Sequence, residues 1–111
     1  MNYQDILDFW FAPENQPSWF AKNDAFDQAI EKRFKTVLQS ASRSELWNWR
    51  SSAEGRLAEI IVLDQFSRNL FRNSPLAFAQ DALALALAQE AISQSLDQQL
   101  RPEQRSFLYM P

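Results

Sequence analysis

Residues 53–69 are apolar on nearly every side of a helix over their first two-thirds, and this pattern predicts a buried central helix. Ser51 and Glu54 have the spacing of a capping box, which places the beginning of the helix beside them. Gly55, in the first turn, costs about 1 kcal/mol relative to alanine. That cost is tolerable where a neighbouring helix or a tryptophan passes close to the glycine.

Apolar residues at steps of three and four predict further helices on both sides of this segment. Asn23 or Asp24 caps one of them, and Ser74 followed by Pro75 has the pattern of another helix start. No stretch alternates apolar and polar residues between turn signals, as a half-buried strand would. The sequence therefore predicts an all-α fold of four to five helices. Outside the central helix, they are expected at residues 2–11, 24–41, 75–95 and 102–110.

Aromatic residues are unusually frequent, with nine Phe, four Trp and two Tyr among 111 residues. Each buries about 150–250 Å² in a folded protein, so these side chains carry much of the packing energy. Core packing and a peptide-binding groove are two alternative roles for them. The residues open to either interpretation are Phe9, Trp10, Phe11, Trp19, Phe20, Trp47 and Trp49.

The composition narrows the classes of function. The 11 basic and 14 acidic residues are interspersed, so the chain lacks the basic stripe that a nucleic-acid backbone requires. Histidine and cysteine are absent, which removes the commonest general base, the commonest zinc ligands and thiol chemistry. The acidic N-terminal segment is unlike a signal peptide, and no apolar run approaches the roughly 20 residues of a membrane span. We expect a cytoplasmic protein with no cofactor, bound metal, nucleic-acid partner or membrane partner.

A burst of polar residues ends the central helix: Asp64, Gln65, Arg68 and Asn69. Asp64 points to the side where apolar residues point, and Arg68 stands four residues later, where a carboxylate and a guanidinium meet. Because buried polar groups need partners, two interpretations remain open. The two residues form either the floor of a binding pocket or a structural ion pair that fixes how the third and fourth helices join.

Asp81 and two more arginines extend this cluster. Asp81 has mostly apolar neighbours on its helix, and with Asp64 it is a candidate for a general acid/base pair or for two oxygen ligands of a divalent metal. The structural alternative is that Asp81 accepts hydrogen bonds from Arg68, Arg72 or Arg105. These arginines are also candidates for an anion site that binds a phosphate or a partner's carboxylate. The acids available to pair with them instead are Asp81, Glu59 and Glu103.

Five short motifs follow one another along the whole chain. They are ILDFWF at 6–11, WFAKNDAFD at 19–27, LDQFSRNLFR at 63–72, FAQDALALA at 78–86 and RSFLYMP at 105–111. Together they resemble, in order, a bacterial family, the domain-of-unknown-function family 924. The resemblance implies stacked antiparallel helix pairs, similar to tetratricopeptide repeats, and implies no activity. A scan of the sequence itself for a repeat of about 34 residues finds no convincing self-similarity.

The resemblance also suggests that the chain is one part of a longer protein. Family members continue past the YMP-like segment into a stretch with histidine and glutamate and into further helices. We therefore expect residues 1–111 to form a single helical domain, the N-terminal part of a longer fold. Phe107, Leu108, Tyr109 and Met110 would leave an apolar face for a partner subunit to cover. Ser95 stands where relatives often carry glycine, which argues against a left-handed helix cap.

The leading functional hypothesis is a non-enzymatic scaffold that presents a groove to a peptide, a protein or a second copy of itself. Reversing the charge of Arg72 is then expected to weaken partner binding without changing the melting temperature. The alternative is an enzyme, or a protein that binds a small anion or a metal, whose pocket is completed by groups from outside this chain. The candidate binding residues are Asp64, Gln65, Arg68, Asn69, Arg72, Asp81 and Arg105.

Overall fold

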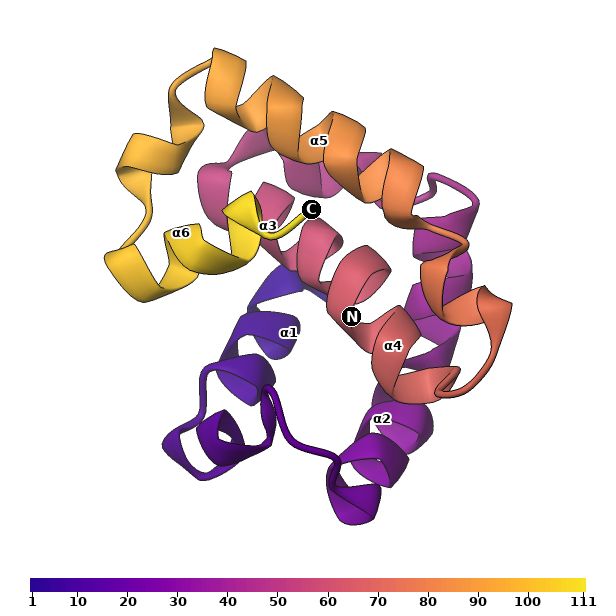
Figure 1. Cartoon of the computed structure of the whole chain (residues 1–111). Coiled ribbons are helices and arrows are strands. Elements are labelled where there is room, and N and C mark those ends of the chain that lie inside the picture. Colours follow the sequence, from indigo (N-terminus) through magenta and orange to yellow (C-terminus); the bar gives the residue numbers. More distant parts are fainter.

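The computed structural model describes residues 1–111, and all of its regular elements are helical (Figure 1). Because α3, the π-helical segment η3 and α4 follow one another without a break, the chain contains five longer helical units, and the all-α prediction is confirmed. The α-helices are α1 (Tyr3–Trp10), α2 (Asp24–Ser42), α3 (Ala53–Ile61), α4 (Ser67–Leu70), α5 (Asp81–Ser93) and α6 (Pro102–Tyr109). The shorter segments are η1 (Pro13–Ser18), η2 (Trp47–Ser51), η3 (Val62–Phe66), η4 (Pro75–Phe78) and η5 (Leu96–Gln99).

The helix beginnings are set by side-chain caps. Asn2, Asn23 and Ser74 each accept a hydrogen bond from a free backbone N–H at the start of the helix that they precede. The capping box predicted at Ser51 is wrong, because Ser51 still belongs to η2. Ser52 caps α3 instead, and its hydroxyl accepts from the backbone N–H of Gly55.

The helix predicted to be central does lie in the middle of the molecule. Helices α1, α5 and α6 pack against α3, while α2 packs against η3 and α4 (Figure 1). Leu57, Ile60 and Ile61 are completely buried in one continuous hydrophobic core. A Cβ atom on Gly55 would collide with the backbone carbonyl of Trp49, so the expected close approach of a tryptophan is confirmed. None of the helices has both the length and the apolar composition needed to cross a membrane.

The fourth helix predicted at 75–95 is wrong in its extent. The chain leaves helical geometry at Gln80, which separates η4 from α5, and α5 ends at Ser93. The break changes the direction of the chain immediately before Asp81. Ser95 adopts a left-handed conformation with φ of 59°, so the left-handed cap that the absence of glycine placed in doubt is present.

The C-terminal aromatic residues pack against the N-terminal part of the chain. Phe107 and Leu108 are buried, and the Phe107 ring lies 4.8 Å from the ring of Trp19. The predicted uncovered apolar face is therefore wrong for these two residues and is reduced to Tyr109 and Met110, which are exposed. Most of the aromatic residues that could belong either to the core or to a peptide-binding groove are part of the core or pack against it. The exceptions are Phe20 and Trp47, which are exposed.

Candidate binding groove

A π-helical turn, η3, positions the polar end of the central helix. In such a turn the backbone hydrogen bonds span one residue more than in an α-helix. These turns are rare in proteins as a whole, and those that occur are often found at functional sites. Asp64 lies within the turn, and Arg68 belongs to the α-helical turn that follows. The period of apolar residues does not reveal this extra residue, so the sequence did not predict it.

Asp64 is only 5% exposed and is held by two neighbours. The Nη1 of Arg68 donates to both the side-chain Oδ1 and the backbone carbonyl of Asp64, each at 2.6 Å. The side-chain amide of Gln65 donates to the other carboxylate oxygen at 2.9 Å. Burial raises the pKa of the Asp64 carboxyl above its ordinary value, and the charge of Arg68 and the hydrogen bonds from Gln65 and Arg68 only partly oppose this.

Arg68 lies between two carboxylates rather than leaving them to face each other. Its Nη2 donates to Oδ2 of Asp81 at 3.2 Å, which joins α4 to α5. The predicted pairing of Asp81 with an arginine is therefore confirmed for Arg68. The side chain of Asp81 is 44% exposed, so its apolar helical neighbours do not bury it. No group of three or more Asp or Glu side chains is arranged so that it could hold a metal ion.

Asn69 and Arg72 share an acid that the sequence analysis did not single out. Asp27 of α2 accepts from Nδ2 of Asn69 at 2.8 Å, and from Nε and Nη2 of Arg72 at 2.6 and 3.2 Å. The acids expected for Arg72 pair with other arginines: Asp81 with Arg68, Glu59 with Arg50 and Glu103 with Arg101. Asp27 stands beside the apolar stripe of α2, and this position was the feature of the sequence that could have marked it as a partner for these side chains.

Three adjoining cavities meet at Arg68, and we call them together the Arg68 groove. One cavity, of about 380 Å³, is called the main cavity because five of the predicted binding residues line it, and it shares Asp64 and Met110 with a second cavity of about 210 Å³. It shares Lys22 and Arg72 with a third cavity of about 410 Å³. The groove is thus an extended surface feature with Arg68 at its centre.

The structure brings together all but one of the residues predicted to bind. Asp81 lines the second cavity, whereas Arg105 lies outside the groove and donates through Nε to the carbonyl of Leu100. Lys22 and Met110 also line the main cavity and were not among the residues predicted to bind, although the sequence placed Met110 on an apolar face for a partner to cover. The predicted residues that line the main cavity are Asp64, Gln65, Arg68, Asn69 and Arg72.

Comparison with known proteins places this arrangement in a family. The family described as "Bacterial protein of unknown function (DUF924)" matches residues 6–111. The chain belongs to this family. The structure of a protein of unknown function from Agrobacterium tumefaciens is similar over 98% of this chain, with 40% sequence identity and a TM-score of 0.92. The chain spans 61% of the length of that protein. No curated protein matches.

Proposed function

We propose that the chain is a non-enzymatic binding module whose Arg68 groove takes an acidic segment of a peptide or protein partner. The observation that carries the proposal is the gathering of Lys22, Arg68 and Arg72 on the main cavity. Asp64 is the acid on the same wall, and Arg68 already pairs with it. An anionic group from a partner therefore meets three cations on the cavity lining, each of which is already paired with an acid of the chain.

The two arginines are held ready for such a partner. Asp27 and Asp81 fix the guanidinium groups of Arg72 and Arg68, so little side-chain freedom remains to be lost on binding. Nε of Arg68 and Nη1 of Arg72 make no hydrogen bond within the chain. These N–H groups are donors for a carboxylate of the partner.

Exposed apolar side chains on the same groove favour a partner that also carries an aromatic residue. Phe20 and Met110 line the main cavity, Phe78 lines the third, and all three are exposed. Aromatic residues, methionine and arginine are enriched in protein interfaces. In this proposal the groove belongs to a tetratricopeptide-like stack of helices, and the protein acts in the cytoplasm.

Lys22 is a better probe of the groove than Arg72. Arg72 is tied to Asp27, so reversing its charge would set two negative charges against each other and lower stability. The expectation that such a change leaves the melting temperature unaltered is therefore withdrawn. Lys22 makes only an exposed pair with Asp24 at 3.4 Å, which contributes little to stability.

The test is a selection of random linear peptides displayed on phage against the protein. We expect the recovered peptides to carry Asp or Glu next to an aromatic residue. Lys22→Glu should weaken their binding by roughly three- to tenfold, as expected for a reversed charge at an interface. Lys32→Glu makes the same change on the exposed part of α2 outside the groove and should have no effect.

Recovery of no acidic peptides, or equal losses of affinity in the two variants, would refute the groove proposal.

The alternative function, an enzyme or a protein that binds a small anion or metal, is favoured by one observation: burial raises the pKa of Asp64 beside a cavity. A thermal-shift screen with phosphate, citrate and magnesium distinguishes it. Such a ligand at 100 times its Kd adds about 2.7 kcal/mol to the free energy of unfolding.

A further inference from the structure

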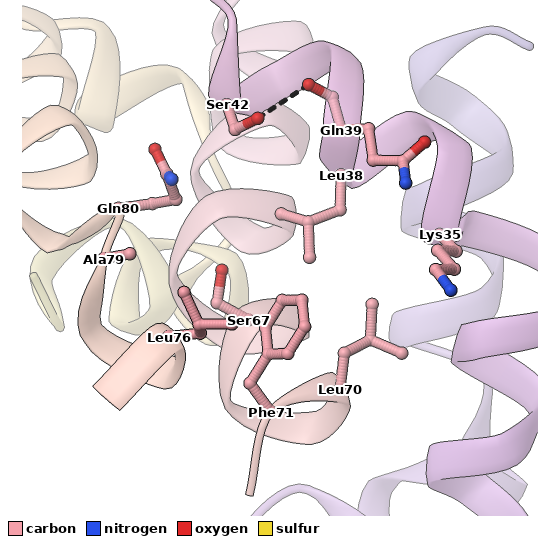
Figure 2. Close-up of a pocket in the computed structure, with 10 residues that line it drawn as sticks. All are labelled: Lys35, Leu38, Gln39, Ser42, Ser67, Leu70, Phe71, Leu76, Ala79 and Gln80. Carbon is pink, nitrogen blue, oxygen red and sulfur yellow. Dashed lines mark hydrogen bonds between the residues drawn. The ribbon is translucent and has the colours of Figure 1, made fainter. Parts of the chain in front are cut away.

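A separate cavity of about 170 Å³ lies between α2, α4 and η4. It shares no residue with the Arg68 groove. Figure 2 shows the side chains of Leu38, Leu70 and Phe71 pointing toward one another across it, from α2 on one side and from the end of α4 on the other. Leu76 and Ala79 add further apolar surface. A cavity of this kind takes an apolar body rather than a charged one.

Of the five polar residues that line the cavity, only Ser67 is buried, and it has no partner; the other four are Lys35, Gln39, Ser42 and Gln80. Ser67 is only 1% exposed, and its hydroxyl oxygen makes no hydrogen bond within the protein. Buried hydroxyl groups are nearly always hydrogen-bonded, so an orphan is an exception that calls for an explanation. Figure 2 shows the Ser67 oxygen directed from α4 toward the side of the cavity where Leu38 lies.

We propose that this cavity binds a single-ring aromatic alcohol, whose hydroxyl hydrogen-bonds to Ser67. An apolar protein cavity of roughly 150 Å³ holds a benzene molecule, so about 170 Å³ has room for one ring with a small substituent. The buried, unpartnered hydroxyl of Ser67 offers one hydrogen bond to the ligand. Phenol is the simplest compound with both properties.

The Ser67 hydroxyl is not open to solvent, so a ligand reaches it only when a side chain at the cavity moves. The hydroxyl oxygen is covered by the surrounding side chains, and Leu76 of η4 is one of those at the cavity. Leu76 is 55% exposed, so in this proposal its side chain is the one that turns outward.

The test is a titration of the whole chain with phenol and, separately, with benzene. The readout is the NMR signals of ¹³C-labelled leucine methyl groups. Phenol should shift the methyl signals of Leu38, Leu70 and Leu76 along a saturable curve and leave those of Leu57, in the core, unchanged. Benzene should bind roughly three- to tenfold more weakly than phenol, which corresponds to the net free energy of one hydrogen bond between neutral groups. Absence of saturation, or shifts spread over all leucines, would overturn the proposal.

Two variants test the contact. In Ser67→Ala the preference for phenol over benzene should disappear, because the phenol hydroxyl then has no partner; a preference that persists would overturn the role of Ser67. Ala79→Leu, at an exposed position on the cavity, should abolish the binding of both compounds by filling the space. Unchanged binding in this variant would contradict the location even if Ser67→Ala fails to fold. Lys22→Glu should leave the titration unaltered, so the outcome is independent of the Arg68 groove.

Discussion

At the scale of single residues, burial and hydrogen bonding act on the ionisation of Asp64 in opposite directions. Burial raises its pKa, whereas Arg68 and Gln65 lower it, and burial is the larger influence. The two interpretations of the Asp64–Arg68 pair therefore do not exclude each other. The pair joins helices through Asp81, and it also forms part of the wall of a cavity.

Asp64→Asn should change the free energy of unfolding by no more than about 1 kcal/mol at pH 7. Arg68 is partly exposed and keeps Asp81 as a partner, so the substitution does not leave a buried charge alone. The measurement is urea unfolding of both proteins. A loss of about 3–5 kcal/mol would instead mean that the pair is essential to the architecture.

The same two proteins should differ in the pH dependence of their stability. Because the pKa of Asp64 is raised in the folded state, that state binds the proton more tightly than the unfolded chain does. The contribution of Asp64 to stability is therefore largest at acid pH and falls as the pH rises from the ordinary value of 3.8 through the folded-state pKa. Relative to Asp64→Asn, the wild type should gain stability as the pH is lowered from 7 to 4. A constant difference between the two would contradict this.

At the scale of elements, a buried ion pair joins η2 to α3. Glu59 is completely buried and accepts from Nε and Nη2 of Arg50 at 2.9 and 2.8 Å. Arg56 donates in turn to the backbone carbonyl of Arg50 at 2.9 Å. These contacts hold the connecting segment against the central helix, whose first turn is already crowded by Trp49 at Gly55.

Arg50→Ala should lower the free energy of unfolding by about 3–5 kcal/mol, because it leaves the Glu59 carboxylate buried and unpaired. Arg43→Ala is the matched control, since Arg43 pairs with Glu45 at 3.1 Å on the surface with both side chains exposed. It should cost less than about 1 kcal/mol. Denaturant unfolding measures both values, and similar losses in the two variants would show that burial of the acid is not the cause.

The elements could be predicted from the sequence wherever local spacing decides them. Helices α1 and α2 begin at Asn2 and Asn23 because a cap and an amphipathic period act within one or two turns. The π-helical turn at Val62–Phe66 and the break at Gln80 were missed. Both change the direction of side chains between packed helices, so they depend on neighbours that are distant in the sequence.

At the scale of the whole molecule, an aromatic cluster joins the two ends of the chain. The ring of Phe107, in α6, lies 5.4 Å from that of Trp10 and 5.8 Å from that of Phe11, in edge-to-face geometry. Helix α6 also packs on α3. The C-terminal helix is therefore part of the same core as α1 and should unfold with it.

Phe107→Ala should lower the free energy of unfolding by about 3–5 kcal/mol, as expected for loss of a buried ring. Phe78→Ala, which removes an exposed ring, is the control for this substitution and should cost less than about 1 kcal/mol.

In the wild type, the near-ultraviolet circular dichroism of the tryptophans and the far-ultraviolet signal of the helices should change together on heating. Separate transitions for the two signals would show that α6 and α1 do not unfold as one unit.

The sequence by itself determined the helices, the central place of residues 53–69 and the meeting of Asp64 with Arg68. Each of these depends on spacing within one helix, where the period of 3.6 residues relates position to direction. Only the tertiary structure decided that Arg72 pairs with Asp27, 45 positions earlier, and that Arg105 stays apart from the groove. Those outcomes follow from the packing of α2 against α4 and of α6 on α3, and no local spacing encodes which surfaces of separate helices come together.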